Sequence, residues 1–264
     1  MEPVEGARTF QTTGGAYDAF MGRYSRALAP AFADRLHLTP GNTALDVGCG
    51  PGALTGVLVE RLGAAAVLAC DPSPGFVDEC AARHPGVEVR AGRAEAVPFS
   101  DGRVDVAAAQ LVLHFVTDPA AAAGELVRVV RPGGTIGACV WDFHDGMEML
   151  RAFWDAALEL DADAPDEART LRFGRPGEIA ELFAEAGLND IEESTLEVRS
   201  EYRDFDELWA GFLAGIGPAG AYAAALAPPV RAELGDRLRR RLGNPPAAFG
   251  LTAVARVATA TRPE

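Results

Sequence analysis

The sequence predicts an α/β protein built on one mainly parallel β-sheet with helices on both faces. Three observations predict this fold class. Short apolar runs of strand length alternate with helical patterns from about residue 30 onward. The first of these runs ends in a glycine-rich loop, residues 48–52, and a helical pattern follows it. The 264 residues are 48% hydrophobic, which is enough for the large core that such a sheet requires.

The first half of the chain alternates predicted helices and strands. A first helix is expected over residues 30–38, where Thr39-Pro40-Gly41 ends it. The expected strands are residues 43–47, 66–70, 87–91, 104–109 and 135–140. The expected helices between them are residues 54–62, 73–83 and 119–130, and the last is closed by the turn at residues 131–134. Strands in such βα repeats pair in parallel.

Beyond Trp141 the pattern changes to helices that are rich in aromatic residues. The expected helices are residues 145–160, 176–186, 204–215, 219–226 and 230–242. The expected strands are residues 191–198 and 249–258. Near the N-terminus, Tyr17, Phe20, Met21 and Tyr24 also have helical spacing. The arginine run of residues 237–241 is interpreted as a solvated helix face.

Composition narrows the classes of partner. A net charge of −14 and a pI of about 4.7 argue against nucleic acid, which requires a basic surface. No signal peptide is evident, and no apolar run approaches the ~18 residues that span a membrane. The four cysteines form no C-x-x-C pair, so reduced thiols in a cytoplasmic protein are expected. No metal-ligand spacing is recognisable, and a small-molecule substrate is predicted.

The glycine loop predicts a nucleoside ligand, because glycines after a strand leave backbone N–H groups free near a ligand. Gly48, Gly50 and Ala53 fit the loose dinucleotide pattern, and Asp71 follows near the usual ~20-residue offset. An NAD(P)-dependent oxidoreductase therefore remains an alternative. Asp46 inside the first strand and Pro51 inside the loop favour a different nucleoside.

Two further segments complete a recognisable set of motifs. Gly-Arg-Ala-Glu-Ala-Val-Pro-Phe at residues 92–99 follows the third strand, and Arg-Pro-Gly-Gly at residues 131–134 precedes the fifth. With the loop Leu-Asp-Val-Gly-Cys-Gly-Pro-Gly, the chain resembles the class I S-adenosylmethionine-dependent methyltransferases. It is most similar to the small-molecule group that includes the ubiquinone and menaquinone methyltransferases, methyltransferase type 11. The resemblance covers roughly residues 17–142.

The resemblance implies a Rossmann-like, seven-stranded sheet whose last strand is antiparallel. The whole chain, residues 1–264, would then form a single domain. Residues 10–38 would be an N-terminal helical lid, and residues 41–142 the cofactor-binding core. Residues 143–264 would complete the core and add helices that cap the substrate.

The resemblance also implies roles at the cofactor, S-adenosyl-L-methionine, whose product is S-adenosyl-L-homocysteine. Gly48 and Gly50 would let the methionyl part lie against the backbone, and Asp46 would orient the loop or meet the cofactor's ammonium group through the loop. Asp71 would accept hydrogen bonds from both ribose hydroxyls. The other residues implied at the cofactor are Tyr17, Tyr24, Cys49, Pro72, Ser73, Ala94, Glu95, Gln110 and Leu111. Structural roles stay open for the acids: capping for Asp71, loop bonding for Asp46 and turn formation for Glu95.

One departure from the family pattern concerns the adenine. The family often has Asp where this chain has Arg93, and a guanidinium cannot accept a hydrogen bond from the adenine amino group. Adenine contact is then expected to rest on backbone groups or on Glu95.

Methyl transfer from a sulfonium is a direct displacement, so the enzyme chiefly aligns the reactants, which can supply ~7–11 kcal/mol. His114 follows the fourth strand and is the first candidate base, with packing under the cap as its alternative. Asp142 and His144 are further candidates. The residues expected to line an apolar acceptor pocket are Met21, His114, Trp141, Phe143, Met147, Trp154 and Trp209. For each of these residues, plain core packing is the alternative.

The sequence thus predicts methyl transfer to a small, apolar or aromatic molecule, with O-, N- and C-methylation all open. Residues 110–113 lack the signature of amino-group methyltransferases that act on nucleic acids, so no nucleic-acid partner is expected. No membrane partner is expected either, and the protein is predicted to be a monomer or homodimer. A non-catalytic S-adenosylmethionine-binding protein is the second alternative.

Overall fold

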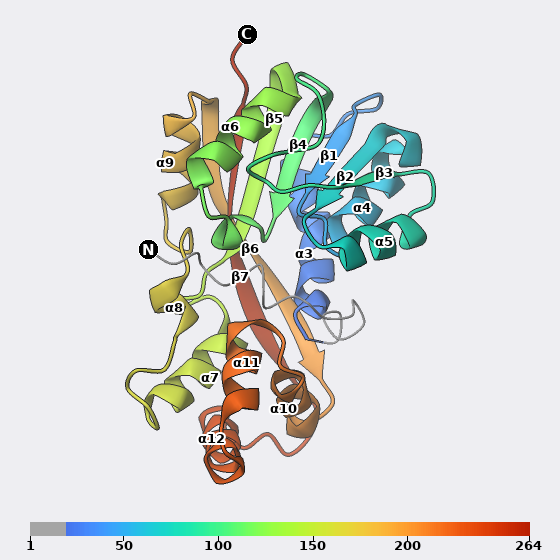
Figure 1. Ribbon diagram of the computed structural model, residues 1–264. Helices are drawn as coiled ribbons and strands as arrows, with labels where there is room; N and C mark the ends of the chain where they lie inside the picture. The colour runs from blue at the N-terminus through green and yellow to red at the C-terminus, as the bar shows by residue number, and fades with distance from the viewer. Residues whose placement is uncertain (1–19) are drawn as a thin grey trace.

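One seven-stranded sheet runs through the computed structural model, which describes residues 20–264 (Figure 1). The strand order is β3-β2-β1-β4-β5-β7-β6. The strands are β1 (Ala44–Val47), β2 (Val67–Asp71), β3 (Glu88–Ala91), β4 (Val104–Gln110), β5 (Val130–Trp141), β6 (Asn189–Tyr202) and β7 (Phe249–Thr261). Strands β1 to β5 are parallel, and β7 is antiparallel to both β5 and β6. The predicted fold class is confirmed.

Helices cover both faces of the sheet because successive strand residues point to opposite sides. Ala44 of β1 packs in the same apolar cluster as α3 (Gly22–Arg35) and α4 (Ala53–Leu62). Leu45 of β1 packs in the opposite cluster with α6 (Pro119–Val129) and α9 (Glu178–Glu185). The remaining core elements are α5 (Pro74–Arg83), η1 (Ala64–Ala66) and η2 (Leu113–Phe115). Each of the three helices predicted between the strands is present within one residue.

Several predicted boundaries were wrong, among them those of α3, β5 and β6. Helix α3 begins at Gly22 rather than residue 30, so Pro30 lies inside it. Tyr24, Leu28 and Phe32 are fully buried along this helix. Burial of each contributes about 1.5–3 kcal/mol, which together exceeds the ~3 kcal/mol cost of an internal proline. The expected turn at residues 131–134 instead belongs to β5.

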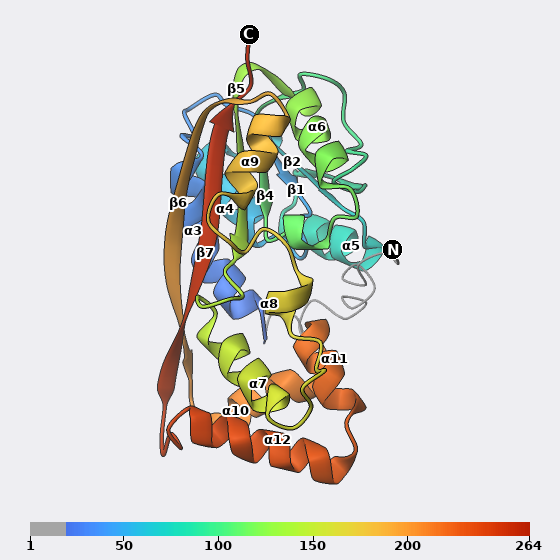
Figure 2. The ribbon, with the colours of Figure 1, turned by 90° about the vertical axis from the view of Figure 1, so that its left-hand side faces the viewer.

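The second half of the chain forms a cap of helices beyond the carboxyl ends of the parallel strands (Figures 1 and 2). The cap helices are α7 (Glu148–Leu158), α8 (Glu167–Thr170), α10 (Phe205–Leu213), α11 (Gly217–Ala225) and α12 (Pro228–Arg241). Strands β6 and β7 are 14 and 13 residues long, and they extend from the sheet into the cap. Helix α8 was not predicted, since four residues are too few to show helical periodicity.

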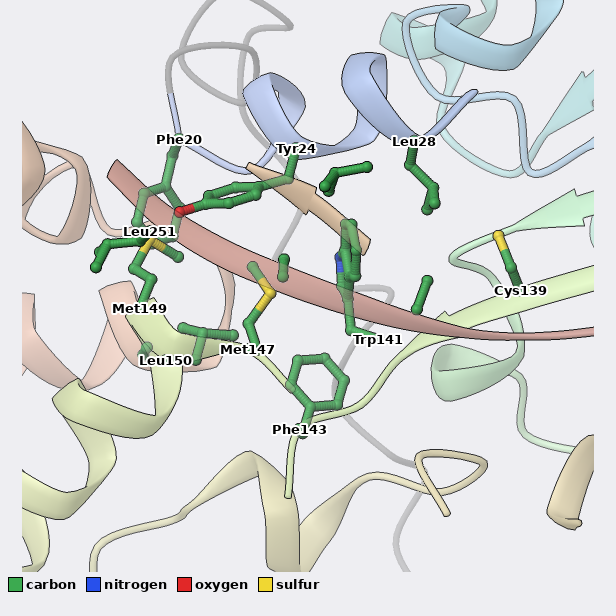
Figure 3. Packing of buried hydrophobic residues seen from close by; sticks show 14 of the residues in the cluster. Phe20, Tyr24, Leu28, Cys139, Trp141, Phe143, Met147, Met149, Leu150 and Leu251 are labelled. Carbon is green, nitrogen blue, oxygen red and sulfur yellow. The ribbon is translucent and has the colours of Figure 1, made fainter. Parts of the chain in front are cut away.

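Aromatic side chains form the interior of the cap. Phe153 of α7 stacks on Phe212 of α10 with 4.3 Å between ring centroids. Tyr24 meets the edge of Trp141 at 6.2 Å, and its hydroxyl lies 3.0 Å from that of Tyr202 (Figure 3). In residues 20–264 no single helix is long and apolar enough to cross a membrane, although α10 and α11 together reach that length and composition across an 85° bend.

Candidate active site

The loop between β1 and α4 is tightly bonded on one side and open on the other. Gly48 and Cys49 donate backbone hydrogen bonds to the carbonyl of Cys70 at 2.7 and 3.0 Å. Gly48 has a φ of 71° and Gly50 a φ of 51°, both in the left-handed region that favours glycine. A Cβ on Gly48 would lie 2.4 Å from the Val112 side chain, whereas one on Gly50 would meet nothing within 4 Å. A ligand therefore has access to the backbone at Gly50.

Asp71 closes this loop from the end of β2. Its Oδ2 accepts from the N–H of Gly50 at 2.9 Å, and its Oδ1 accepts from the N–H of Ser73 at 2.8 Å. Burial raises the pKa of this carboxyl above its usual value, although the two backbone donors oppose the shift. Each carboxylate oxygen can accept another hydrogen bond, so two ligand hydroxyls can still be received.

Asp46 lies behind the loop rather than in it. The side chain is 1% exposed, and its Oδ2 accepts from the Thr55 hydroxyl in the first turn of α4 at 2.6 Å. Burial raises the pKa of Asp46 to about 7. Asp46 thus ties β1 to α4 and orients the loop between them. Cys49 is buried beside Cys80 in the same region.

In the segment after β3, side-chain contacts of Glu95 fix the backbone. Glu95 accepts from the backbone N–H and the hydroxyl of Thr117 at 2.9 and 3.0 Å. Arg93 is exposed and lies 3.5 Å from Glu95. This geometry supports the structural interpretation of Glu95. Ala94 is buried and Pro72 is exposed.

Gln110 and Leu111 end β4 with two unusual features. The Nε2 of Gln110 donates to the carbonyl of Ser25 at 3.1 Å, while its buried Oε1 has no hydrogen-bond partner among residues 20–264. Leu111 has a φ of 63°, which costs a non-glycine residue about 1–2 kcal/mol. A buried acceptor without a donor and a strained backbone are typical of a ligand site.

A small apolar cavity of about 40 Å³ adjoins this strand end and reaches into the cap. Its lining residues are Met21, Leu111, His114, Phe115, Trp141, Phe143, Leu150, Glu167 and Ala219. Four predicted acceptor residues, Met21, His114, Trp141 and Phe143, therefore come together from α3, η2 and the segment around the end of β5. Figure 3 shows Trp141 and Phe143 extending from the segment around the end of β5.

The structure does not bring the other three predicted pocket residues to this cavity. Met147 is fully buried and bridges to Ala253 of β7. Trp154 is buried in the cap, where its indole N–H donates a hydrogen bond to another side chain of the cap. Trp209 packs against Phe205 and the backbone of Gly235. All three pack in the cap, as the alternative interpretation allowed.

His114 lies in the cavity wall with both ring nitrogens occupied. Its Nδ1 is 2.8 Å from the Arg172 carbonyl, which fixes that nitrogen as the donor. Its Nε2 accepts from the backbone N–H of Trp141 at 2.9 Å. Burial lowers the pKa of His114 to about 4. A neutral imidazole without a free nitrogen fits packing better than proton transfer.

The other candidate bases are also held by the protein. Asp142 accepts from Arg256 at 2.6 Å and from the backbone N–H groups of His144 and Asp145. These donors hold the pKa of Asp142 below its usual value in spite of desolvation. The Nε2 of His144 lies 3.2 Å from Nε of Arg175. Neither side chain lines the cavity.

Glu167, which was not predicted from the sequence, is the one carboxyl-bearing side chain among the described residues that line the cavity. It is 4% exposed, and its Oε2 accepts from the indole N–H of Trp154 at 2.7 Å. Burial raises its pKa to about 7. No sequence signal identifies it, because it lies in the acidic stretch of residues 161–167, which is typical of a solvated loop.

Two implied cofactor contacts remain as predictions. Tyr17 lies outside the described residues. Tyr24 is fully buried, and its hydroxyl is paired with Tyr202. Within residues 20–264 there is no group of three or more His, Cys, Asp or Glu side chains that could hold a metal ion.

A protein-family model described as "Methyltransferase domain" matches residues 45–138. The match contains the glycine loop, Asp71 and the strained end of β4. This segment is a class I methyltransferase domain. The resemblance to the small-molecule methyltransferases is confirmed for this segment, and the methyl donor of that family is S-adenosyl-L-methionine. The match favours methyl transfer over nicotinamide chemistry for the same glycine pattern.

Two curated relatives are similar to about half of the chain. The chain is 35% identical over 134 residues to a malonyl-[acyl-carrier protein] O-methyltransferase of Serratia marcescens, covering 49% of this chain and 50% of that protein. It is 34% identical over 142 residues to a demethylmenaquinone methyltransferase of Corynebacterium kroppenstedtii, covering 52% and 60%. The chain spans about half the length of the curated relatives that it matches.

A solved structure shares the architecture of the methyltransferase domain and its cap. Phosphoethanolamine N-methyltransferase 2 of Haemonchus contortus, in complex with S-adenosyl-L-methionine, matches 97% of this chain and 58% of its own with a TM-score of 0.60. The sequence identity is 15%, so the likeness concerns the fold.

Proposed function

We propose that the whole chain transfers a methyl group from S-adenosyl-L-methionine to a small, apolar or aromatic molecule bound in the cavity under the cap. One observation carries this proposal. The apolar cavity includes Leu111 in its wall, and Leu111 directly follows Gln110 at the end of the strand that flanks the glycine loop. Donor and acceptor sites therefore share the carboxyl end of β4, where α/β sheets bind ligands.

The described residues fit the methyl donor. Asp71 offers two partly free carboxylate oxygens for ribose hydroxyls, and Gly50 offers unobstructed backbone. The unpartnered Oε1 of Gln110 can accept from the donor's ammonium group. When bound, S-adenosyl-L-methionine supplies an electrophilic methyl group on a sulfonium. The protein then aligns the acceptor and excludes water with its apolar wall.

The remaining features of the proposal concern the chain as a whole. The described cap helices are proposed to form a single domain with the sheet, whereas residues 10–19 of the predicted lid lie outside the described residues. A net charge of −14 supports a small molecule rather than a nucleic acid as the acceptor. A monomer or homodimer is compatible with a cavity lined by one chain.

Calorimetric titration with S-adenosyl-L-homocysteine tests the donor site. Wild-type protein is expected to bind it and not NADH. Asp71→Ala removes two charge-assisted hydrogen bonds, each worth about 1.5–3 kcal/mol, so the dissociation constant should rise at least tenfold. Asp78→Ala, on the exposed face of α5, is the matched control and should bind as wild type does.

Affinity for NADH without affinity for S-adenosyl-L-homocysteine would refute the proposal. Equal affinities of wild type and Asp71→Ala would remove Asp71 from the site while leaving the methyl donor in place.

A further inference from the structure

We infer that Glu167 is the acceptor-recognition residue of the cavity, and that the acceptor receives its methyl group on an oxygen or nitrogen that carries a hydrogen. This inference rests on the proposed function and narrows its substrate class. It selects hydroxyl- and amine-bearing molecules, and it excludes acceptors that offer only carbon.

The inference starts from the two oxygens of Glu167. Oε2 accepts from the indole N–H of Trp154 at 2.7 Å, which fixes the orientation of the carboxyl group. No hydrogen bond to Oε1 forms within residues 20–264, and this oxygen is not one of the fully enclosed unpartnered atoms there, so it stays accessible at the cavity wall. An accessible carboxyl oxygen in a mainly apolar wall can accept a hydrogen bond from a ligand.

Among the described lining residues, Glu167 is the side chain that can accept a hydrogen bond from an acceptor molecule. The other side chains of the cavity wall are apolar or aromatic, except for His114. Both ring nitrogens of His114 are already hydrogen-bonded to backbone groups. Among the described lining residues, Trp141 also has a buried indole N–H without a hydrogen-bond partner.

The charges near Glu167 keep it titratable. Burial raises its pKa to about 7, the indole of Trp154 opposes this shift, and the neighbouring carboxylate of Asp166 adds to it. Asp166 is itself neutralised by Arg151 at 2.9 Å, and His114 is neutral. A carboxyl with a pKa near the working pH is well matched to accept a proton.

For an acceptor O–H or N–H group, the proposed reaction is a direct displacement at the methyl carbon with transfer of the acceptor's proton to Glu167. The acceptor's lone pair forms a bond to the methyl carbon as the carbon–sulfur bond breaks. The electron pair of that bond stays on sulfur, which leaves as the thioether of S-adenosyl-L-homocysteine. The acceptor's proton passes to Oε1 of Glu167, and the carboxylic acid returns it to solvent after the product leaves.

Binding of simple ring probes tests the inference without any turnover. Ligand-observed NMR would measure the affinities of phenol, aniline and toluene for wild type and for Glu167→Gln. At pH 8.5 the preference of wild type for phenol or aniline over toluene should fall about fivefold in Glu167→Gln, because a charged acceptor is replaced by a neutral one. Gln can still accept from Trp154, so the variant should fold.

The pH dependence separates recognition from a structural role. In wild type the preference for phenol or aniline over toluene should rise between pH 5.5 and 8.5, as Glu167 ionises. In Glu167→Gln it should stay flat. Glu181→Gln, an exposed glutamate of α9, makes the same charge change away from the cavity and should keep the wild-type profile.

Two results would overturn the inference. One is an unchanged preference for both probes in Glu167→Gln, and the other is the absence of phenol and aniline binding to wild type. Because these titrations need no methyl donor, they are independent of the S-adenosyl-L-homocysteine titration that tests the proposed function.

Discussion

Burial determines the charge of the titratable side chains around the cavity, and it acts in opposite directions on acids and bases. The pKa of His114 falls to about 4, so the imidazole is neutral at pH 7. The pKa values of Asp46 and Glu167 rise to about 7. The carboxyl of Asp46 accepts a hydrogen bond from the Thr55 hydroxyl behind the loop. The carboxyl of Glu167 accepts from Trp154 through Oε2, which leaves Oε1 available in the cavity. The same physical effect therefore yields a structural acid behind the loop and a chemically available acid in the cavity.

His114 gives a prediction for stability against pH. Its pKa lies below the ~6.5 of an unfolded chain, so between these values the unfolded state binds more protons. The stability from neutral His114 is complete above pH 6.5 and is lost as the pH falls towards 4, in total about 3 kcal/mol. Urea unfolding at pH 7.5 and 4.5 should show a larger loss for wild type than for His114→Gln.

The raised pKa values of the Asp46 and Glu167 carboxyls do not affect the comparison of wild type with His114→Gln. Asp46 and Glu167 contribute with the opposite sign, since their stabilisation is lost as pH rises towards 7. They are present in both proteins, so their effects cancel in the difference. Equal losses for wild type and His114→Gln would show that His114 is not held neutral by burial.

At the scale of elements, the loop between β1 and α4 places its glycines under two different constraints. Gly48 is fixed by the protein, because its α-carbon faces the Val112 side chain. Among residues 20–264 nothing lies where a Cβ on Gly50 would point, so Gly50 is constrained by its backbone angle and by its hydrogen bond to Asp71. The alternation of glycines in the sequence does not distinguish these roles, which depend on the segment after β4.

This distinction predicts different effects of one added methyl group. Gly48→Ala combines left-handed strain with a clash and should lower the free energy of unfolding by about 3 kcal/mol. Gly50→Ala should cost only about 1 kcal/mol of stability, yet it should weaken S-adenosyl-L-homocysteine binding by blocking the open face. Urea unfolding and calorimetry on both variants measure the two quantities. Full cofactor affinity in a stable Gly50→Ala protein would contradict the placement of the ligand there.

At the scale of the whole molecule, the long β6–β7 hairpin joins the cap to the sheet (Figure 2). Its pairing is continuous from Glu192↔Thr259 to Tyr202↔Phe249, so the strands that complete the sheet also support the cap. On the outer side, the arginine run of α12 pairs with acids of α7 and α10, namely Asp155, Glu159 and Asp206. The run is therefore a surface ion-pair network rather than a simple solvated face.

The packing of the cap gives the last prediction. Phe153 is fully buried and stacked on Phe212, so Phe153→Ala should lower the free energy of unfolding by about 3–5 kcal/mol. Leu213→Ala, one residue beyond Phe212 and 40% exposed, is the control and should change it by less than about 1 kcal/mol. Urea unfolding measures both variants. A loss at Phe153 as small as at Leu213 would mean that the cap interior is not tightly packed.

The sequence by itself determined the sheet and the nucleoside loop, because these depend on local signals, and its set of motifs indicated the methyl donor through the resemblance to a family. Apolar periodicity marks strands, glycines mark the loop, and Asp71 lies at a fixed offset from it. Only the tertiary structure decided which side chains line the acceptor cavity. Met21, Leu111, Trp141 and Glu167 come from distant segments, and the aromatic residues that pack the cap have the same spacing as those that face the cavity. Glu167 in particular is a surface-type residue by sequence, and only the burial of α8 against Trp154 gives its carboxyl a raised pKa and a free oxygen.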